Sequence, residues 1–337
     1  MMFEDRVQQI KMLDIGQTAP GTISRSWLHI INNGLGEAVR IPILVARGRR
    51  DGPVLGLTAA LHGNELNGIP LIQQLFAELS ESLPELRGTV VGVLAMNIPG
   101  LLREQRVFND GVDLNHIAPG RADGTVSQVY VYRLVERIVR HFDYLIDLHT
   151  ASFGRVNAYY IRADMGSPVS ARMARLQGPE IIVHNPPNDK TLRGVATSLG
   201  IPSITAELRD PQRFQADVIE AGLIGMRNVL HDLDMLQGAI SCPVEETILC
   251  SGSHWLYTDE GGLLAVLPRP GDLLTEGQPI AEVRTIFGEV TKTYHAPSDG
   301  VVIGRSVNPI NQTGSRILHI GHEPKPIPCL VPFYKES

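Results

Sequence analysis

Two apolar segments of the chain end in a histidine, and a glutamate follows one of these histidines closely. His62 follows residues 54–61, Glu65 stands three residues later, and His149 follows residues 142–148. A catalytic zinc ion takes three protein ligands and keeps one position for water, and two histidines with one glutamate form an established ligand set. The pattern predicts one zinc ion bound by His62, Glu65 and His149, and therefore a zinc hydrolase.

The surroundings of these residues carry the argument, because a histidine and a glutamate three residues apart are common by chance. Each histidine ends an apolar strand, where a buried imidazole needs a polar partner that a metal ion supplies. Asp147 lies two residues before His149 and therefore points to the same side of the predicted strand. It either orients His149 through a hydrogen bond or is an ordinary carboxylate near a strand end.

Strands and helices alternate through the first part of the chain. The apolar and periodic patterns predict strands at 54–61, 88–97, 142–149, 159–162, 181–183 and 203–207, and helices at 69–80, 126–141, 168–177, 190–199 and 212–236. This order is typical of an α/β fold whose mixed, mainly parallel sheet carries helices on both faces. Ligands bind such sheets at the carboxyl ends of the strands, where His62 and His149 stand.

The character of the sequence changes near Cys242, from where short alternating runs are interrupted by glycine and proline. Turns at this density without helical periodicity predict a small all-β domain. We therefore expect a catalytic domain over residues 1–238, a β-barrel-like domain over residues 239–323 and a C-terminal tail over residues 324–337. Within the first domain, residues 98–124 lack periodicity, which is typical of a functional loop.

The composition is that of a globular protein and argues against two classes of partner. Of 337 residues, 43% are hydrophobic and 20% are charged, the net charge is −6, and the pI is near 6.0. Because there is no long basic run, we expect neither nucleic acid nor an anionic membrane surface as a partner. The expected partner is a small-molecule substrate, and the sequence leaves open whether the chain forms a homo-oligomer.

Two features favour a cytoplasmic protein. No apolar stretch reaches the ~18–20 residues that span a bilayer. The first residues lack the basic-then-apolar order of a signal peptide. Cys242, Cys250 and Cys329 form an odd and sparse set, which favours reduced thiols over a disulfide framework.

Several short motifs occur together in one order and spacing. They are His62-Gly-Asn-Glu65, Met96-Asn-Ile-Pro99, Arg106, Asp113-Leu-Asn115, Pro119-Gly120, Asp147-Leu-His149 and Thr205-Ala-Glu-Leu208. In this arrangement the chain resembles the succinylglutamate desuccinylase and aspartoacylase family, which belongs to the zinc carboxypeptidase superfamily. The resemblance spans most of residues 40–322 and implies a zinc-carboxypeptidase-like fold for the first domain.

The resemblance also implies roles for individual residues. Zinc would be held by His62, Glu65 and His149, and Glu207 would serve as general base and then as general acid. Arg106 matches the arginine that such enzymes place against the scissile carbonyl, where a fixed cation stabilises the oxyanion.

Substrate binding departs from the family pattern at one position. Asn115 matches the first half of an Asn-Arg pair that binds the substrate carboxylate, but His116 stands where the family commonly has arginine. A histidine offers no bidentate, permanently charged fork to a carboxylate. Either the substrate lacks a carboxylate there, or the charge comes from Arg103, Arg121, Arg155 or Arg209. We take Asn115, His116 and Arg155 as the candidate substrate-binding residues.

The second domain resembles a biotinyl/lipoyl-type β-domain over residues 262–302. Carrier domains place a lysine on an exposed hairpin, whereas here residues 285–288 occupy the turn and Phe287 falls near the lysine's place. We therefore predict no prosthetic group on this domain. Lys292 is only a weak candidate for the missing carrier lysine.

These observations favour a zinc-dependent amidohydrolase that removes the acyl group from an N-acyl amino acid or a related small amide. A zinc carboxypeptidase acting on short peptides would use the same chemistry, although His116 weakens the grip on a terminal carboxylate. A third interpretation is a metal-dependent ligand-binding protein with a degenerate site. The presence of His62, Glu65, His149 and Glu207 together argues against that interpretation.

Overall fold

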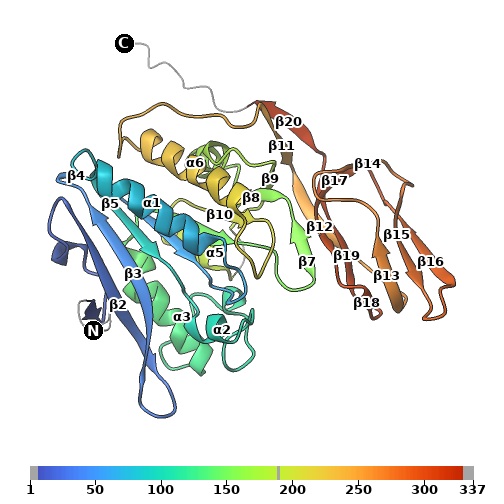
Figure 1. The fold of residues 1–337 in the computed structure, drawn as a ribbon, viewed down its shortest axis with the longest axis horizontal. Coiled ribbons are helices and arrows are strands. Elements are labelled where there is room, and N and C mark those ends of the chain that lie inside the picture. The colour runs from blue at the N-terminus through green and yellow to red at the C-terminus, as the bar shows by residue number, and fades with distance from the viewer. Residues whose placement is uncertain (1–6, 188–189, 329–337) are drawn as a thin grey trace.

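A computed structural model describes residues 7–187 and 190–328, and its centre is an 11-stranded sheet (Figure 1). From one edge to the other, the strands are β1 (Gln8–Ile10), β2 (Thr22–Asn32), β3 (Ala38–Arg47), β5 (Arg87–Val93), β4 (Arg50–Ala59), β6 (Tyr144–His149), β10 (Ser203–Leu208), β8 (Tyr159–Ala163), β9 (Ile181–His184), β11 (Glu246–Cys250) and β20 (Lys325–Pro328).

The middle of this sheet gathers strand ends at one edge. β5, β4, β6 and β10 run parallel to one another, whereas on either side β3 runs antiparallel to β5 and β8 runs antiparallel to β10. The sheet is therefore mixed, as the sequence predicts. Because parallel strands point the same way, their carboxyl ends meet. Glu207 near the end of β10 lies in register with His149 at the end of β6.

Helices cover both faces of the sheet, and each face has its own apolar core. α1 (Gly68–Ser82), α4 (Pro168–Leu176) and α6 (Ala216–Asp232) pack on one face, where α1 and α6 lie side by side (Figure 1). α3 (Val126–Arg137) and α5 (Leu192–Ser198) pack on the other face. The remaining helical segments are α2 (Ile98–Leu102) and the 3₁₀ turns Ile15–Gln17, Leu114–His116 and Val139–His141. No helix of the described residues is long and apolar enough to cross a membrane.

The C-terminal part is built from two further sheets, in agreement with the predicted all-β character. One sheet contains β12 (Gly252–Tyr257), β19 (Arg316–His322), β17 (Gly300–Ser306) and β14 (Leu273–Leu274), and the other contains β16 (Val290–His295), β15 (Pro279–Arg284), β13 (Gly262–Val266) and β18 (Ile310–Asn311). Their apolar side chains form a separate core that includes Ile280, Val283, Val302, Leu318 and Ile320.

Short strands link the two parts across the expected boundaries at residues 238 and 323. β11 joins the large sheet beside β9, and β20, from the segment expected as a tail, pairs with β11. In the opposite direction, β7 (Arg155–Asn157) leaves the α/β part and pairs with β17. β7, β11 and β20 are short, and their partners lie far away in the sequence. The local sequence pattern is therefore too weak to predict these strand pairs.

One of the three cysteines differs from expectation. Cys242 takes part in a disulfide, so the expectation of reduced thiols is wrong for this residue. Cys250 is a free and buried cysteine, and burial raises the pKa of its thiol to about 12. Cys329 lies outside the described residues.

The glycine of the His62–Glu65 motif is required by close packing. A β-carbon on Gly63 would lie 2.0 Å from the carbonyl carbon of Gly100 and 2.2 Å from the amide nitrogen of Leu101, both in α2. Backbone atoms have little freedom to yield, so Gly63→Ala should lower the free energy of unfolding by about 1–3 kcal/mol in urea denaturation. Gly34→Ala, at a hairpin turn with open space around it, is the matched control. Equal stability of the two variants would contradict this packing.

Candidate active site

Three buried side chains converge at the carboxyl edge of the central strands. His62 and Glu65 lie between β4 and α1, in a turn closed by a hydrogen bond from the Glu65 amide to the His62 carbonyl, and His149 ends β6. The Nδ1 atom of His149 lies 3.1 Å from Nδ1 of His62 and 2.9 Å from a carboxylate oxygen of Glu65. Nδ1 of His62 lies 3.0 Å from the other Glu65 oxygen.

The donor atoms of this group fit a metal ion. Nε2 of His62 lies 3.0 Å from Oδ1 of Asp113, and Nε2 of His149 lies 2.8 Å from Oδ2 of Asp147. A neutral imidazole that donates through Nε2 carries its lone pair on Nδ1, so both lone pairs point at the same small space. Their 3.1 Å separation is close to the ~3.3 Å that two nitrogens show in a tetrahedral zinc site. Two lone pairs this close repel each other, and a cation bound between the two Nδ1 atoms would remove that repulsion.

Asp147 orients His149, as one of the two sequence interpretations proposed. Its second oxygen accepts a 2.6 Å hydrogen bond from the Thr58 hydroxyl on the neighbouring strand β4. Burial lowers the pKa of His149, but Asp147 and Glu65 outweigh burial and raise this pKa well above its ordinary value. The surroundings of His149 therefore favour positive charge.

Asp113 makes contacts that its place in a sequence motif does not predict. It joins His62 to Arg106, whose Nε donates to Oδ2 of Asp113 at 2.8 Å. Nη1 of Arg106 donates to Glu65 at 2.8 Å. Burial raises the pKa values of both carboxyls, yet their histidine contacts prevail and lower the two values below their usual range.

Glu207 stands across the same space from β10, and Oε1 of its carboxylate lies 3.6 Å from Nε of Arg162. Arg162 in turn donates to the Tyr160 hydroxyl at 2.8 Å. A strand-end carboxylate with one cation beside it has a defined position and can still accept a proton from a molecule in the pocket.

A pocket of about 300 Å³ contains every site residue that the sequence predicted. It is lined by His62, Glu65, Arg106, Asn115, His116, His149, Thr150, Ala151, Ser152, Arg155, Asn157, Tyr160, Arg162, Asn185, Thr191, Arg193, Thr205, Glu207 and Trp255. Most of the lining is polar or charged, and four of the residues are arginines. Such a lining suits a small anionic ligand better than an apolar one.

His116 lies at the margin of this pocket. Its side chain is 71% exposed, and its Nε2 is 3.6 Å from Asp113. Asn115 uses its side-chain oxygen to accept a 2.8 Å hydrogen bond from the Leu192 amide. The structure thus holds Asn115 in place and leaves His116 without a firm contact.

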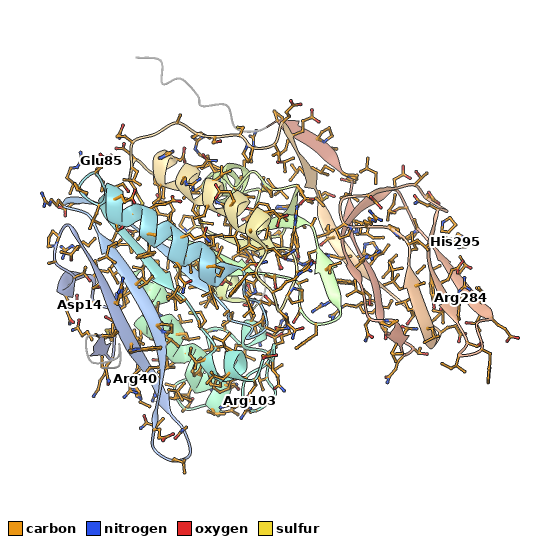
Figure 2. The ribbon with its side chains drawn as sticks, in the orientation of Figure 1. Asp14, Arg40, Glu85, Arg103, Arg284 and His295 are labelled. Atoms are coloured by element: carbon orange, nitrogen blue, oxygen red, sulfur yellow. The ribbon has the colours of Figure 1, made fainter. Side chains whose placement is uncertain are left out.

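Of the four arginines considered as substitutes for the missing charge, Arg155 alone is among the pocket-lining residues. Arg121 pairs with Asp123, and Arg209 pairs with Glu180 and Asp217. Arg103 is exposed on the surface (Figure 2).

Sequence reasoning missed Arg162, Arg193 and Trp255. Trp255 comes from β12 of the C-terminal part, in which the sequence predicts no site residue. Because alternate residues of a strand share one face, the predicted strand at 159–162 places Tyr160 and Arg162 on the same side, and this signal could have identified the pair.

Known proteins resemble the chain over most of its length. A curated relative, the N-alpha-acetyl-L-2,4-diaminobutyric acid deacetylase of Halomonas elongata, is 27% identical over 281 residues, covering 80% of this chain and 81% of that protein. The product-bound ectoine utilization protein EutE (DoeB) from Ruegeria pomeroyi has a TM-score of 0.79 at 21% identity, covering 90% of this chain and 98% of that one. A succinylglutamate desuccinylase/aspartoacylase from Rhodobacter sphaeroides also has a TM-score of 0.79 at 21% identity, covering 92% of this chain and 98% of that one.

The family model for the succinylglutamate desuccinylase/aspartoacylase catalytic domain matches residues 51–233. This range is more than half of the chain, and it contains the three candidate metal ligands, Arg106 and Glu207. The chain therefore belongs to the succinylglutamate desuccinylase/aspartoacylase family.

Proposed function

We propose that this protein is a zinc-dependent deacylase that hydrolyses the amide bond of an N-acyl amino acid or a related small amide. The observation that carries the proposal is that the candidate metal ligands, a candidate base and several arginines line one pocket. The chain is a hydrolase of carbon–nitrogen bonds other than peptide bonds, since its family consists of desuccinylases and aspartoacylases and its curated relative is a deacetylase.

His62, Glu65 and His149 would hold the zinc ion. When bound, zinc polarises a carbonyl group and lowers the pKa of water to about 7. Asp113 and Asp147 keep the two imidazoles in the tautomer that presents Nδ1 to the ion. The aqueous medium of the pocket supplies the water that the reaction consumes.

Glu207 would move the proton during hydrolysis. It takes the proton from the attacking water and delivers it to the amine nitrogen as the carbon–nitrogen bond breaks, so one residue acts as base and then as acid. Arg162 holds the Glu207 carboxylate on the pocket side of β10.

Arg106 would stabilise the oxyanion that develops on the scissile carbonyl. Its Nε and Nη1 are held by Asp113 and Glu65, and Nη2 has no hydrogen bond to any residue in the described ranges. Nη2 is therefore available to donate a hydrogen bond to the oxyanion. Because the Arg106 side chain is already held in place, it needs no reorganisation during the reaction.

Asn115, His116 and Arg155 are the proposed substrate-binding residues. His116 is exposed at the margin and is a poor substitute for the family arginine. The cationic pocket nevertheless favours an anionic substrate. The relative from Halomonas elongata is an N-alpha-acetyl-L-2,4-diaminobutyric acid deacetylase, which supports an N-acyl amino acid with a small acyl group as the substrate.

The C-terminal β-domain would be a biotinyl/lipoyl-like domain that carries no prosthetic group. Phe287 is 90% exposed in the β15–β16 turn, at the place expected for a carrier lysine. Lys292, the one substitute considered, pairs with Asp259 at 2.9 Å. A role in shaping the active site is better supported than a carrier role.

Replacement of the proposed base tests the mechanism. Glu207→Gln keeps the size of the side chain but removes its ability to take a proton, so kcat should fall by about 10²–10⁴-fold while zinc remains bound. Steady-state deacylation assays and metal analysis measure the two effects. Glu81→Gln, on the exposed face of α1, should retain activity. A fully active Glu207→Gln enzyme would rule out this residue as the base.

The contact between Asp147 and His149 predicts an effect on zinc affinity. Asp147→Asn weakens the hydrogen bond that orients His149, so zinc affinity should fall about 10- to 100-fold in competition with a chelator. Asp51→Asn, on the exposed start of β4, is the matched control. Unchanged zinc affinity in Asp147→Asn would mean that His149 is not a ligand.

Substrate profiling tests the consequence of His116. We expect neither N-succinylglutamate nor N-acetylaspartate to be the best substrate, because the arginine that would bind their carboxylate is absent at position 116. Values of kcat/KM for a panel of N-acyl amino acids and short peptides decide the question. Selective hydrolysis of either named compound would refute the expectation, and preference for peptides would favour a carboxypeptidase. Bound zinc without turnover of any amide would favour a ligand-binding protein.

A further inference from the structure

Arg155 belongs to the catalytic part by sequence but is held by the C-terminal part. It begins β7, which pairs antiparallel with β17, and there Ser306 lies opposite Arg155. Two positions along the pair, Gly304 lies opposite Asn157, and a β-carbon on Gly304 would be 2.2 Å from the Asn157 side chain. This close approach fixes how the two parts meet beside the pocket.

Arg155 differs from the other pocket arginines in its partners. Arg106 binds Glu65 and Asp113, Arg162 binds Glu207 and Tyr160, and Arg193 binds Asn185. The Arg155 side chain makes no hydrogen bond or ion pair with any residue of 7–187 or 190–328. Its guanidinium instead lies over the Trp255 ring, 5.6 Å from the ring centroid.

The Trp255 ring is itself held in place. It stacks on His319 with ring centroids 5.0 Å apart and planes inclined by 9°, and Nε2 of His319 contacts the Ser253 hydroxyl at 2.8 Å. The guanidinium of Arg316 is 5.3 Å from the Trp255 centroid. Burial, followed by Arg162 and other cationic neighbours, lowers the pKa of His319 well below its ordinary value, so this ring is neutral.

The charge of Arg155 is incompletely compensated. Burial and then the cations of Arg316 and Arg106 lower its pKa, and the carboxylates of Glu65 and Glu207 offset this effect only in part, although a guanidinium stays protonated at any physiological pH. A charge taken out of water without a partner is unfavourable. An anionic group that entered the pocket next to Arg155 would supply the missing partner in a bidentate geometry.

We propose that Arg155, laid on Trp255, is the carboxylate-binding subsite of this enzyme, and that the C-terminal β-domain thereby completes the active site. The inference rests on the proposed deacylase function and deepens it. The substrate is an N-acyl amino acid with a free carboxylate. Its carboxylate faces β7 and Trp255, and its acyl amide faces His62, Glu65 and His149. Trp255 is a positioning residue, because it acts through Arg155.

The two tryptophans of the chain make a direct binding experiment available. Trp27 and Trp255 are the 2 tryptophans of the sequence, so Trp27→Phe leaves Trp255 as the sole fluorophore beside the proposed subsite. In a zinc-loaded protein that carries Trp27→Phe and Glu207→Gln, we expect N-acetyl amino acids to give a saturable change in fluorescence. The matching α-carboxamides should not, because they lack the negative charge.

Variants of the subsite sharpen the test. Arg155→Gln should weaken acid binding by about 10- to 100-fold, the loss expected for hydrogen bonds to a charged group, whereas Arg103→Gln on the surface should leave it unchanged. Trp255→Leu should reduce the preference for acid over carboxamide, measured by calorimetry in the Glu207→Gln background. Its zinc content and melting temperature show whether it is folded. Arg155→Lys should recover part of the preference, since it keeps the charge but loses the planar fork.

The outcomes separate this inference from the proposed function. Equal binding of acids and carboxamides, unchanged binding in Arg155→Gln, or no response from any acid would each overturn the subsite. A folded, zinc-loaded Trp255→Leu protein with undiminished preference for the acid would overturn the positioning role. If acids bind through Arg155 and the wild-type protein hydrolyses none of them, the subsite stands and the deacylase function fails.

Discussion

The structure depends on two imidazoles that turn their Nδ1 atoms toward each other across 3.1 Å. Such a pair is repulsive when both atoms carry lone pairs, and it is stable only with a cation or proton between them. Asp113 and Asp147 fix this arrangement by contacting the opposite nitrogen of each ring. The parallel sheet makes it possible, because β4 and β6 are neighbours and end at the same edge.

The same edge links the metal ligands to the rest of the site. Asp113 contacts both His62 and Arg106, and Glu207 lies in register with His149. β7 carries Arg155 out of the α/β part and onto β17, so the β-domain reaches the pocket through a strand pair as well as through Trp255. The proposed base and the carboxylate subsite are thus positioned by backbone pairing, whereas the proposed oxyanion donor, Arg106, lies in the segment after α2 and is held there by Asp113 and Glu65.

Much of this could be predicted from sequence because the decisive signals are local. The apolar runs before His62 and His149 indicated buried strands, and the spacing of helices between strands indicated a mixed sheet. The eight predicted site residues line the observed pocket, although their roles stay predictions. The family motifs carried Glu207 and Arg106, which no local pattern distinguishes from surface residues.

The features that escaped prediction depend on distant partners. Trp255 is an ordinary strand residue until β12 is placed beside the pocket. β7 has 3 residues and no periodicity of its own, and its partner β17 lies far along the chain. The contact of Asp113 with His62 requires the segment after α2 to fold back over the strand ends, which neither residue type nor spacing reveals.

The central claim is that His62, Glu65 and His149 bind a single catalytic metal ion. The most direct measurement is a crystal structure of the zinc-loaded protein with diffraction data collected at the zinc absorption edge. The account predicts one strong anomalous peak about 2.0–2.2 Å from Nδ1 of His62, Nδ1 of His149 and a Glu65 oxygen. Zinc bound elsewhere, with no anomalous peak between these three residues, would contradict it.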